Sequence, residues 1–221
     1  MEALEPRLLL DGALGVALVD PQGGPATPFD LLNIHFDRPV QDGSFTAEDI
    51  LLSGPGGPIA PLSDPVKLAD DLYQIDLTGL TGLGEYSLVI GPDILDAATG
   101  QPMDQDGDGT PGEAADSWSG KLLAGGVAIA DGNTAYDGLN LVVYGGTGSL
   151  AGDHGFASAL VTGAAALSIT GGSTLSVVGG LVIQGSSTIV CQAKNTAAQV
   201  GGVWAGEGVT IDAGSLSVET G

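Results

Sequence analysis

Short apolar segments separated by turn-forming residues run along the whole chain, and this spacing limits the possible folds more than any other feature. In LNIHFDRPV, residues 32–40, apolar and polar residues alternate, so Leu32, Ile34 and Phe36 would share one face of a strand. Glycine supplies 38 of the 221 residues, and aromatic residues only 5%. Runs of Ala, Leu, Glu and Lys at helical spacing do not occur. The pattern therefore predicts an all-β fold built from many short strands.

The first half of the chain predicts an antiparallel sandwich. The segments DILLSG, YQIDLTGL and YSLVIGP repeat the alternation and are divided by Gly-Pro and Asp-Pro breakers. Five to seven short strands at roughly ten-residue spacing are typical of an Ig-like sandwich, which we expect over residues 15–124. Residues 1–14 form a separate N-terminal segment.

The spacing of apolar residues changes in residues 125–221. There, pairs of apolar residues two positions apart recur at steps of eight, six and eight residues. Short strands followed by Gly, Ser or Thr turns are typical of the start of a parallel β-helix, or solenoid, in which each coil stacks on the next. A second sandwich is the alternative. We expect the repeat to continue beyond residue 221. The pairs are Leu167 with Ile169, Leu175 with Val177, Leu181 with Ile183, and Ile189 with Cys191.

The net charge of −22 restricts the partners. Nucleic-acid binding requires Lys and Arg to displace counterions, and the chain has only five, so we exclude it. An anionic bilayer repels such a chain, and no apolar run approaches the ~20 residues of a membrane span, so we expect no membrane insertion. Cys191 is the only cysteine, which excludes an internal disulfide, and we expect its thiol to be buried.

The stretch DQDGDGTPGEAAD, residues 104–116, is the best candidate for a metal site. An EF-hand-type calcium loop places ligands at positions 1, 3, 5, 7, 9 and 12, with Gly at position 6. Asp104, Asp106 and Asp108 match the first three positions. Gly109 falls at position 6, and Thr110, at position 7, offers its backbone carbonyl. This spacing is more specific than that of an ordinary acidic loop.

The loop departs from the EF-hand at its last ligand, because position 12 is Ala115. Glu113 and Asp116 lie on either side of that position, and the sequence does not decide which of them completes the site. Calcium takes six to eight oxygen ligands, whereas zinc favours His or Cys, neither of which lies nearby. We therefore predict a structural calcium site that stiffens the chain, with a solvated acidic loop as the alternative. Its predicted ligands are Asp104, Asp106, Asp108, Thr110, Glu113 and Asp116.

Three stretches resemble parts of one family of proteins. MEALEPRLLL, residues 1–10, resembles the LEPR-XLL motif that opens very large repetitive surface or secreted proteins of planctomycete-like bacteria. Residues 15–122 resemble their Ig-like modules, in which an acidic loop precedes the last strand, here the strand with Trp118. Residues 131–221 resemble the β-helical opening of large adhesin-like chains. The residues that match the motif are Leu4, Glu5, Pro6, Arg7, Leu9 and Leu10.

The resemblance implies a secreted or cell-surface bacterial protein, and our leading hypothesis is non-enzymatic. The chain would be the N-terminal part of a large extracellular structural or adhesive protein that calcium stabilises. Its partners would be calcium and a cell-surface or matrix polysaccharide or protein.

The alternative is a carbohydrate-active or carbohydrate-binding β-helix protein. Asp153 and His154 are adjacent and could act in catalysis, although a turn before a strand is the simpler interpretation. A lyase needs a cationic group, and Lys194 is the only Lys or Arg in residues 125–221. Trp204, Tyr136 or Tyr144 could stack on a sugar ring, although single aromatic residues more often pack in a core.

Overall fold

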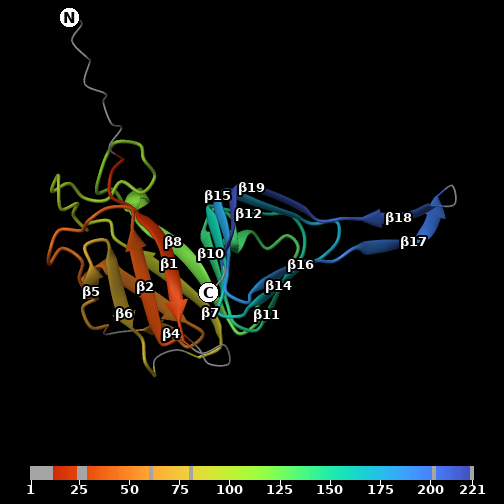
Figure 1. Cartoon of the computed structure of the whole chain (residues 1–221), viewed down its shortest axis with the longest axis horizontal. Coiled ribbons are helices and arrows are strands. Elements are labelled where there is room, and N and C mark those ends of the chain that lie inside the picture. Colours follow the sequence, from red (N-terminus) through yellow and green to blue (C-terminus); the bar gives the residue numbers. More distant parts are fainter. Residues whose placement is uncertain (1–11, 24–28, 60–61, 80–81, 201–202, 220–221) are drawn as a thin grey trace, which may run out of the picture.

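The computed structural model describes residues 12–23, 29–59, 62–79, 82–200 and 203–219, and the side chains of 194–205 are not among them. The LEPR-XLL-like residues therefore lie outside the described part. The chain is 52% strand and 5% helix, an antiparallel sandwich followed by a parallel solenoid of about three turns, which confirms the predicted fold class. In Figure 1 the sandwich lies on the left and the solenoid to its right.

The outer sheet of the sandwich has four antiparallel strands in the order β1-β2-β6-β5. The predicted alternation of β2 is confirmed, since Leu32 and Ile34 are fully buried and Phe36 nearly so. Phe36, Phe45 and Tyr73 pack edge to face in the core beneath this sheet. The strands are β1 (Val16–Gln22), β2 (Leu31–Phe36), β5 (Val66–Ala69) and β6 (Leu72–Asp76).

The second sheet of the sandwich runs without interruption into the solenoid. Strand β8 pairs antiparallel with β7 and parallel with β10, so one sheet has the order β12-β15-β13-β10-β8-β7-β3-β4, with β19 added beside β15. The predicted boundary after residue 124 is the last residue of β8. The antiparallel part contains β3 (Ile50–Gly54), β4 (Gly57–Ile59), β7 (Gly84–Ile90) and β8 (Trp118–Ala124).

Neighbouring residues of β8 face two different cores. Leu122 belongs to the core under the outer sheet, and Leu123 belongs to the core inside the solenoid. The first core also takes in Val142, Tyr144 and Leu160 from the solenoid. The outer sheet thus covers both the sandwich strands and the first solenoid strands.

Each solenoid coil has a first strand in the shared sheet, a glycine-containing corner and a second strand in a separate four-stranded sheet, β16-β14-β11-β9. The first strands run parallel, with Val142 opposite Leu160 and Leu160 opposite Val182. These strands are β10 (Asn140–Tyr144), β13 (Ser158–Thr162), β15 (Thr174–Gln184) and β19 (Thr210–Glu219). The second strands are β9 (Ala128–Ile129), β11 (Thr147–Leu150), β14 (Ala166–Ile169) and β16 (Thr188–Cys191).

The corners stack closely on one another, which explains their composition. The backbone turns through positive φ at Gly125, Gly145 and Gly163, and a Cβ on Gly146 would approach the backbone of Gly125 to 2.7 Å. Ala164, with φ 59°, takes the left-handed conformation in the third coil. Gly146 has no room for a Cβ, because the corner beneath lies too close, whereas the third coil accommodates the Cβ of Ala164.

Three short 3-10 helices and three further strands complete the described elements. β12 pairs with the first half of β15, while β17 and β18 form an antiparallel hairpin that projects from the solenoid (Figure 1). The elements are η1 (Ala47–Asp49), η2 (Ala114–Asp116), η3 (Thr134–Tyr136), β12 (His154–Phe156), β17 (Lys194–Val200) and β18 (Val203–Glu207).

One prediction about the last coils is wrong. Cys191 was expected to be buried, but it is exposed because β16 is the edge strand of its sheet and has no described strand on its outer side. Asp212 is an exposed residue of β19, opposite Ser176. The other predicted pairs lie in β14 and β15, where Leu167, Ile169, Leu175, Val177 and Leu181 are buried.

Candidate metal centre

The acidic loop lies between β7 and β8 and is fastened to the sandwich at its start. Met103 is completely buried, and its carbonyl accepts the amide N–H of Gly112 at 2.9 Å, which closes the loop. Asp104 donates its amide to the carbonyl of Leu14 at 3.1 Å. The side chain of Gln105 accepts the amide of Val16 at 2.7 Å and donates to its carbonyl at 3.3 Å. The start of the loop is therefore hydrogen-bonded to the first residue of β1 and to the segment just before it.

Asp104, Asp106 and Asp108 point into one small volume. Each offers a carboxylate oxygen, and these oxygens all lie within 4.8 Å of one another. At that separation two unit charges repel by about 0.9 kcal/mol in water. None of the ion pairs between residues that the structure describes involves these carboxylates. The backbone thus holds three like charges together without a neutralising side chain in the described part.

Hydrogen bonds within the loop hold these carboxylates in place. The amide of Gly109 donates to Asp104 Oδ2 at 3.0 Å, and the amide of Thr110 donates to Asp108 Oδ1 at 2.7 Å. The amide of Asp108 donates to Asp106 Oδ1 at 3.1 Å. Gly109 has φ 88°, a conformation that favours glycine, so the residue expected at the sharp turn adopts the backbone conformation that such a turn needs.

The Oδ1 atom of Asp104 is the clearest indication of a ligand. It is buried and has no hydrogen-bond partner. Burying a carboxylate oxygen without a partner is unfavourable, by about 1–3 kcal/mol or more for a charged group. A hard cation bound at this oxygen and its two neighbouring carboxylates would remove that penalty, so the residues fit calcium.

The two other predicted acidic ligands lie outside this cluster. Glu113 is exposed and is not among the acids whose oxygens lie within 4.8 Å of one another. Thr110 is exposed, and its backbone carbonyl as a ligand stays a prediction. Asp116 is 1% exposed, and its Oδ2 accepts the amide of Glu113 at 2.8 Å, a bond that caps the start of η2. The sequence left open whether Glu113 or Asp116 completes the site, and in this structure Asp116 supports the backbone before β8 instead.

The pair considered for catalysis is separated by its hydrogen bonds. His154 is 3% exposed and lies in β12, where Nδ1 is 3.1 Å from an oxygen of Asp137 and Nε2 is 3.1 Å from the carbonyl of Ala151. Asp153 instead accepts the amide of Thr174 at 2.9 Å. Both ring nitrogens of His154 are therefore occupied, and the two side chains serve the packing of neighbouring coils.

Two of the three aromatic rings considered for sugar stacking are inside the molecule. Tyr136 is 5% exposed and donates its hydroxyl to Glu85 at 2.6 Å. Burial, and secondly this hydrogen bond, raise the pKa of Tyr136 to about 12. Tyr144 is 2% exposed and packs edge to face on Phe29. The side chain of Trp204 lies outside the described residues. Neither described ring is available to stack on a ligand.

Two features of the site were not recognised in the sequence. Gln105, the residue that docks the loop on β1, is an ordinary polar residue in an acidic context, and no local pattern marks its distant partner. The burial of Asp104 depends on the same docking. The long amide side chain at position 2 of the loop is the one local signal, and only the tertiary structure identifies what it contacts.

Comparison with protein-family models gives no match, and comparison with curated proteins finds no similar sequence. Within the described ranges, none of the helices has the length and apolar character needed to cross a membrane.

Proposed function

We propose that this chain is a non-catalytic structural or adhesive module of a secreted or cell-surface bacterial protein, and that its acidic loop binds calcium. The observation that carries this proposal is the convergence of Asp104, Asp106 and Asp108 around the buried, unpartnered Oδ1 of Asp104. Calcium supplies the positive charge that three neighbouring carboxylates require. The resemblance to Ig-like modules of large repetitive surface proteins supports the extracellular setting.

The position of the loop supports a structural role for the ion. The loop connects β7 to β8, and its start is hydrogen-bonded to Val16, the first residue of β1, and to Leu14 just before it. Fixing the loop would therefore fix the first strand of the outer sheet relative to the shared sheet. A module that transmits force or presents a surface gains from such stiffening.

The test is a pair of thermal melts of the 221-residue chain, one in calcium and one in chelator. The calcium concentration is about ten times the dissociation constant of the weakest-binding extracellular calcium modules. Calcium should raise the free energy of unfolding by roughly 1–3 kcal/mol at such an excess. The Asp106→Ala/Asp108→Ala variant should lose this gain, because two of the three clustered carboxylates are removed. The melting temperature, followed by circular dichroism, measures both effects.

A matched control separates calcium binding from general charge reduction. Asp71→Ala/Asp212→Ala removes two exposed carboxylates from other parts of the molecule and should keep the full calcium response. Magnesium at the same concentration should stabilise less, since it demands stricter geometry and gives up its waters reluctantly. Equal melting temperatures with calcium and with chelator would reject the site, and an equal response in both double variants would show a nonspecific charge effect.

Glu113→Ala decides a question that the sequence left open. If Glu113 moves to complete the coordination when calcium binds, this variant should weaken calcium affinity about tenfold or more. An unchanged affinity would mean that water and backbone oxygens complete the shell. Titration calorimetry with calcium measures the difference directly.

A further inference from the structure

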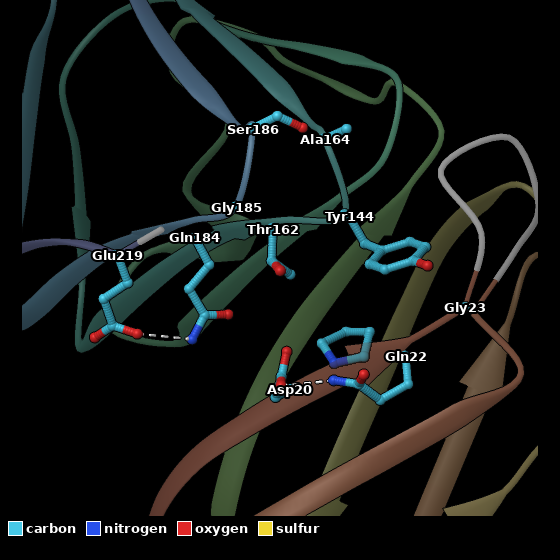
Figure 2. Close-up of a pocket in the computed structure, with 12 residues that line it drawn as sticks. Asp20, Gln22, Gly23, Tyr144, Thr162, Ala164, Gln184, Gly185, Ser186 and Glu219 are labelled. Carbon is cyan, nitrogen blue, oxygen red and sulfur yellow. Dashed lines mark hydrogen bonds between the residues drawn. The ribbon is translucent and has the colours of Figure 1, made fainter. Parts of the chain in front are cut away.

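A second polar site lies where the sandwich meets the corners of the solenoid, away from the acidic loop in sequence. It is a cleft of about 450 Å³, a size within the usual range for small-molecule sites. One wall is the end of β1, and the other is formed by the corners after β13 and β15 together with the end of β19 (Figure 2). The residues that line it are Asp20, Pro21, Gln22, Gly23, Tyr144, Thr162, Gly163, Ala164, Gln184, Gly185, Ser186 and Glu219.

Two carboxylate–amide pairs face each other across this cleft. Gln22 donates its amide to Asp20 Oδ2 at 2.6 Å on the β1 side. Gln184 donates its amide to Glu219 Oε2 at 3.3 Å on the solenoid side. Figure 2 shows both pairs. Each carboxylate can accept further hydrogen bonds, and each amide keeps a carbonyl oxygen and a second N–H.

The electrostatics of the cleft favour a ligand that donates hydrogen bonds. Its lining holds two carboxylates and no Lys, Arg or His side chain, so an anionic ligand would be repelled. Burial raises the pKa of Asp20; His35 and the bond from Gln22 oppose this rise, and the charge of Glu219 adds to it. Additional donors would stabilise the charged form of this partly buried carboxylate.

Size and chemistry distinguish a polyol from a metal ion. A single ion needs several oxygens within a few ångströms of one point, and in the described residues only Asp104, Asp106 and Asp108 form such an acid cluster. Hydroxyl groups on neighbouring carbons of a sugar ring each donate and accept, which a carboxylate beside an amide can match. The hydroxyls of Thr162 and Ser186 add further groups of both kinds.

We propose that this cleft binds a neutral saccharide through Asp20, Gln22, Gln184 and Glu219. The recognition is polar, because the Tyr144 ring that lines the cleft is buried against Phe29 and cannot stack on a sugar. A saccharide would bridge β1 and the last two coils. The site does not include the calcium loop, so it can be tested with or without calcium.

The experiment is saturation-transfer-difference NMR on the full chain with a defined panel of sugars. The panel contains glucose, galactose, mannose, N-acetylglucosamine and β-linked disaccharides of glucose, each at up to about 10 mM to reveal millimolar dissociation constants. Glucuronate and galacturonate serve as anionic counterparts, and propylamine as a cationic probe. We expect saturable transfer to at least one neutral sugar and none to the uronates.

Variants on both walls locate the binding. Asp20→Asn should weaken the affinity for the neutral sugar about tenfold or more, the usual effect of losing a hydrogen bond that involves a charged group, and Gln184→Ala should weaken it about two- to tenfold, the usual effect of losing a neutral hydrogen bond. Asp212→Asn changes an exposed carboxylate of β19 outside the cleft and should leave affinity unchanged. Because the two cleft variants lie on different walls, a folding defect in one leaves the other as the test, with circular dichroism as the check.

Three results would overturn the inference. The first is no saturable transfer to any neutral sugar in the panel. The second is equal affinity in the wild-type chain and the correctly folded cleft variants. The third is binding of propylamine but of no sugar, which would assign the cleft to a cation. Repeating the measurement in chelator keeps this result separate from the calcium test, since the proposed saccharide site requires no metal.

Discussion

Strands β2 and β6 of the outer sheet alternate buried and less buried residues, whereas β10 and β13 of the solenoid are buried at every position after their first. The physical reason is what lies on each face. One side of the outer sheet meets solvent, so each of its strands contributes every second residue to a core. The solenoid strands lie between the outer sheet and the solenoid interior, and both faces of them must be apolar.

This difference teaches that the sandwich and the solenoid are not two modules joined by a linker. Val142, Tyr144 and Leu160 belong to the solenoid by sequence but pack in the core under the outer sheet. Strand β8 completes the sandwich and also starts the stack of parallel strands. A large apolar interface within a chain opposes relative motion of the parts. We therefore expect the two regions to unfold together.

The largest expected effect tests this shared unfolding at neighbouring residues of β8. Leu122 contacts the sandwich core and Leu123 the solenoid core, and both are at most 1% exposed. Leu122→Ala and Leu123→Ala should each destabilise the chain by about 2–5 kcal/mol, the usual loss for a buried leucine. Each should shift one common transition, by roughly 4–20 °C in a chain of this size.

Hydrogen exchange resolved by peptide provides the measurement for this pair. In a cooperative molecule either variant raises exchange in both β2 and β14. Ser119→Ala, on the same strand but only partly buried, is the control and should change little. Two separate transitions, with each variant affecting only its own region, would show that the shared sheet does not couple the two cores.

The second largest expected effect concerns a polar contact between the two regions. It lies on the face of the shared sheet that points away from the outer sheet. Glu85 in β7 accepts a hydrogen bond from Lys121 at 2.7 Å and another from Tyr136 in η3 at 2.6 Å. Lys121 also lies 5.8 Å from the centre of the Tyr136 ring. Glu85→Gln should destabilise the chain by about 1 kcal/mol, because the site is partly exposed and solvent screens the charge.

The pH dependence of this contact follows from its two pKa shifts. Burial alone would raise the pKa of Glu85, but the bonds from Lys121 and Tyr136 outweigh it and lower the pKa. Its stabilisation is therefore present above the usual value of 4.5 and is lost as the pH falls through the lowered pKa. The pKa of Tyr136 is raised from 10.0 to about 12. Its contribution to the stability of the fold is therefore fully present below pH 10 and is lost as the pH rises through about 12.

Melting temperatures of the wild type, Glu85→Gln and Tyr136→Phe across this pH range measure both the loss of stability in acid and the loss in alkali. The difference between wild type and Glu85→Gln should shrink in acid, while the difference between wild type and Tyr136→Phe should shrink above pH 10. A Glu85→Gln deficit that is the same in acid and at neutral pH would mean that the carboxylate charge does not contribute.

The sequence predicted the fold well where only one face of a strand is buried. Alternation identified Leu32, Ile34 and Phe36 as inward residues, and all three are buried. It could not reveal the shared sheet, because LVVY in β10 and ALV in β13 are continuous apolar runs. Such a run is compatible with any strand buried on both faces and does not say what covers it. The packing partner of Tyr144, Phe29, lies far away in sequence.

The candidate metal centre was predictable to the extent that its geometry is local. Asp104, Asp106 and Asp108 come together because alternate residues in a tight glycine-containing turn lie close in space. Glu113 and Asp116 were chosen by their distance from an EF-hand position, but no EF-hand helix follows this loop. A short 3-10 turn follows instead, and Asp116 caps it. Calcium binding itself stays a prediction.

The smallest expected effect is that of Leu216→Ala in the solenoid, judged against the same change at its buried partner Leu181. Leu181 and Leu216 are opposite each other in adjacent coils, yet Leu181 is 1% exposed and Leu216 is 64% exposed. Leu181→Ala should cost about 2–5 kcal/mol, whereas Leu216→Ala should cost about 0.5–1 kcal/mol because most of its side chain already meets water. Denaturant unfolding measures both, with Ser217→Ala, a partly buried neighbour on the opposite face of β19, as the control. A loss at Leu216 equal to that at Leu181, with a melting temperature that rises with protein concentration, would show that a second copy covers this coil in solution.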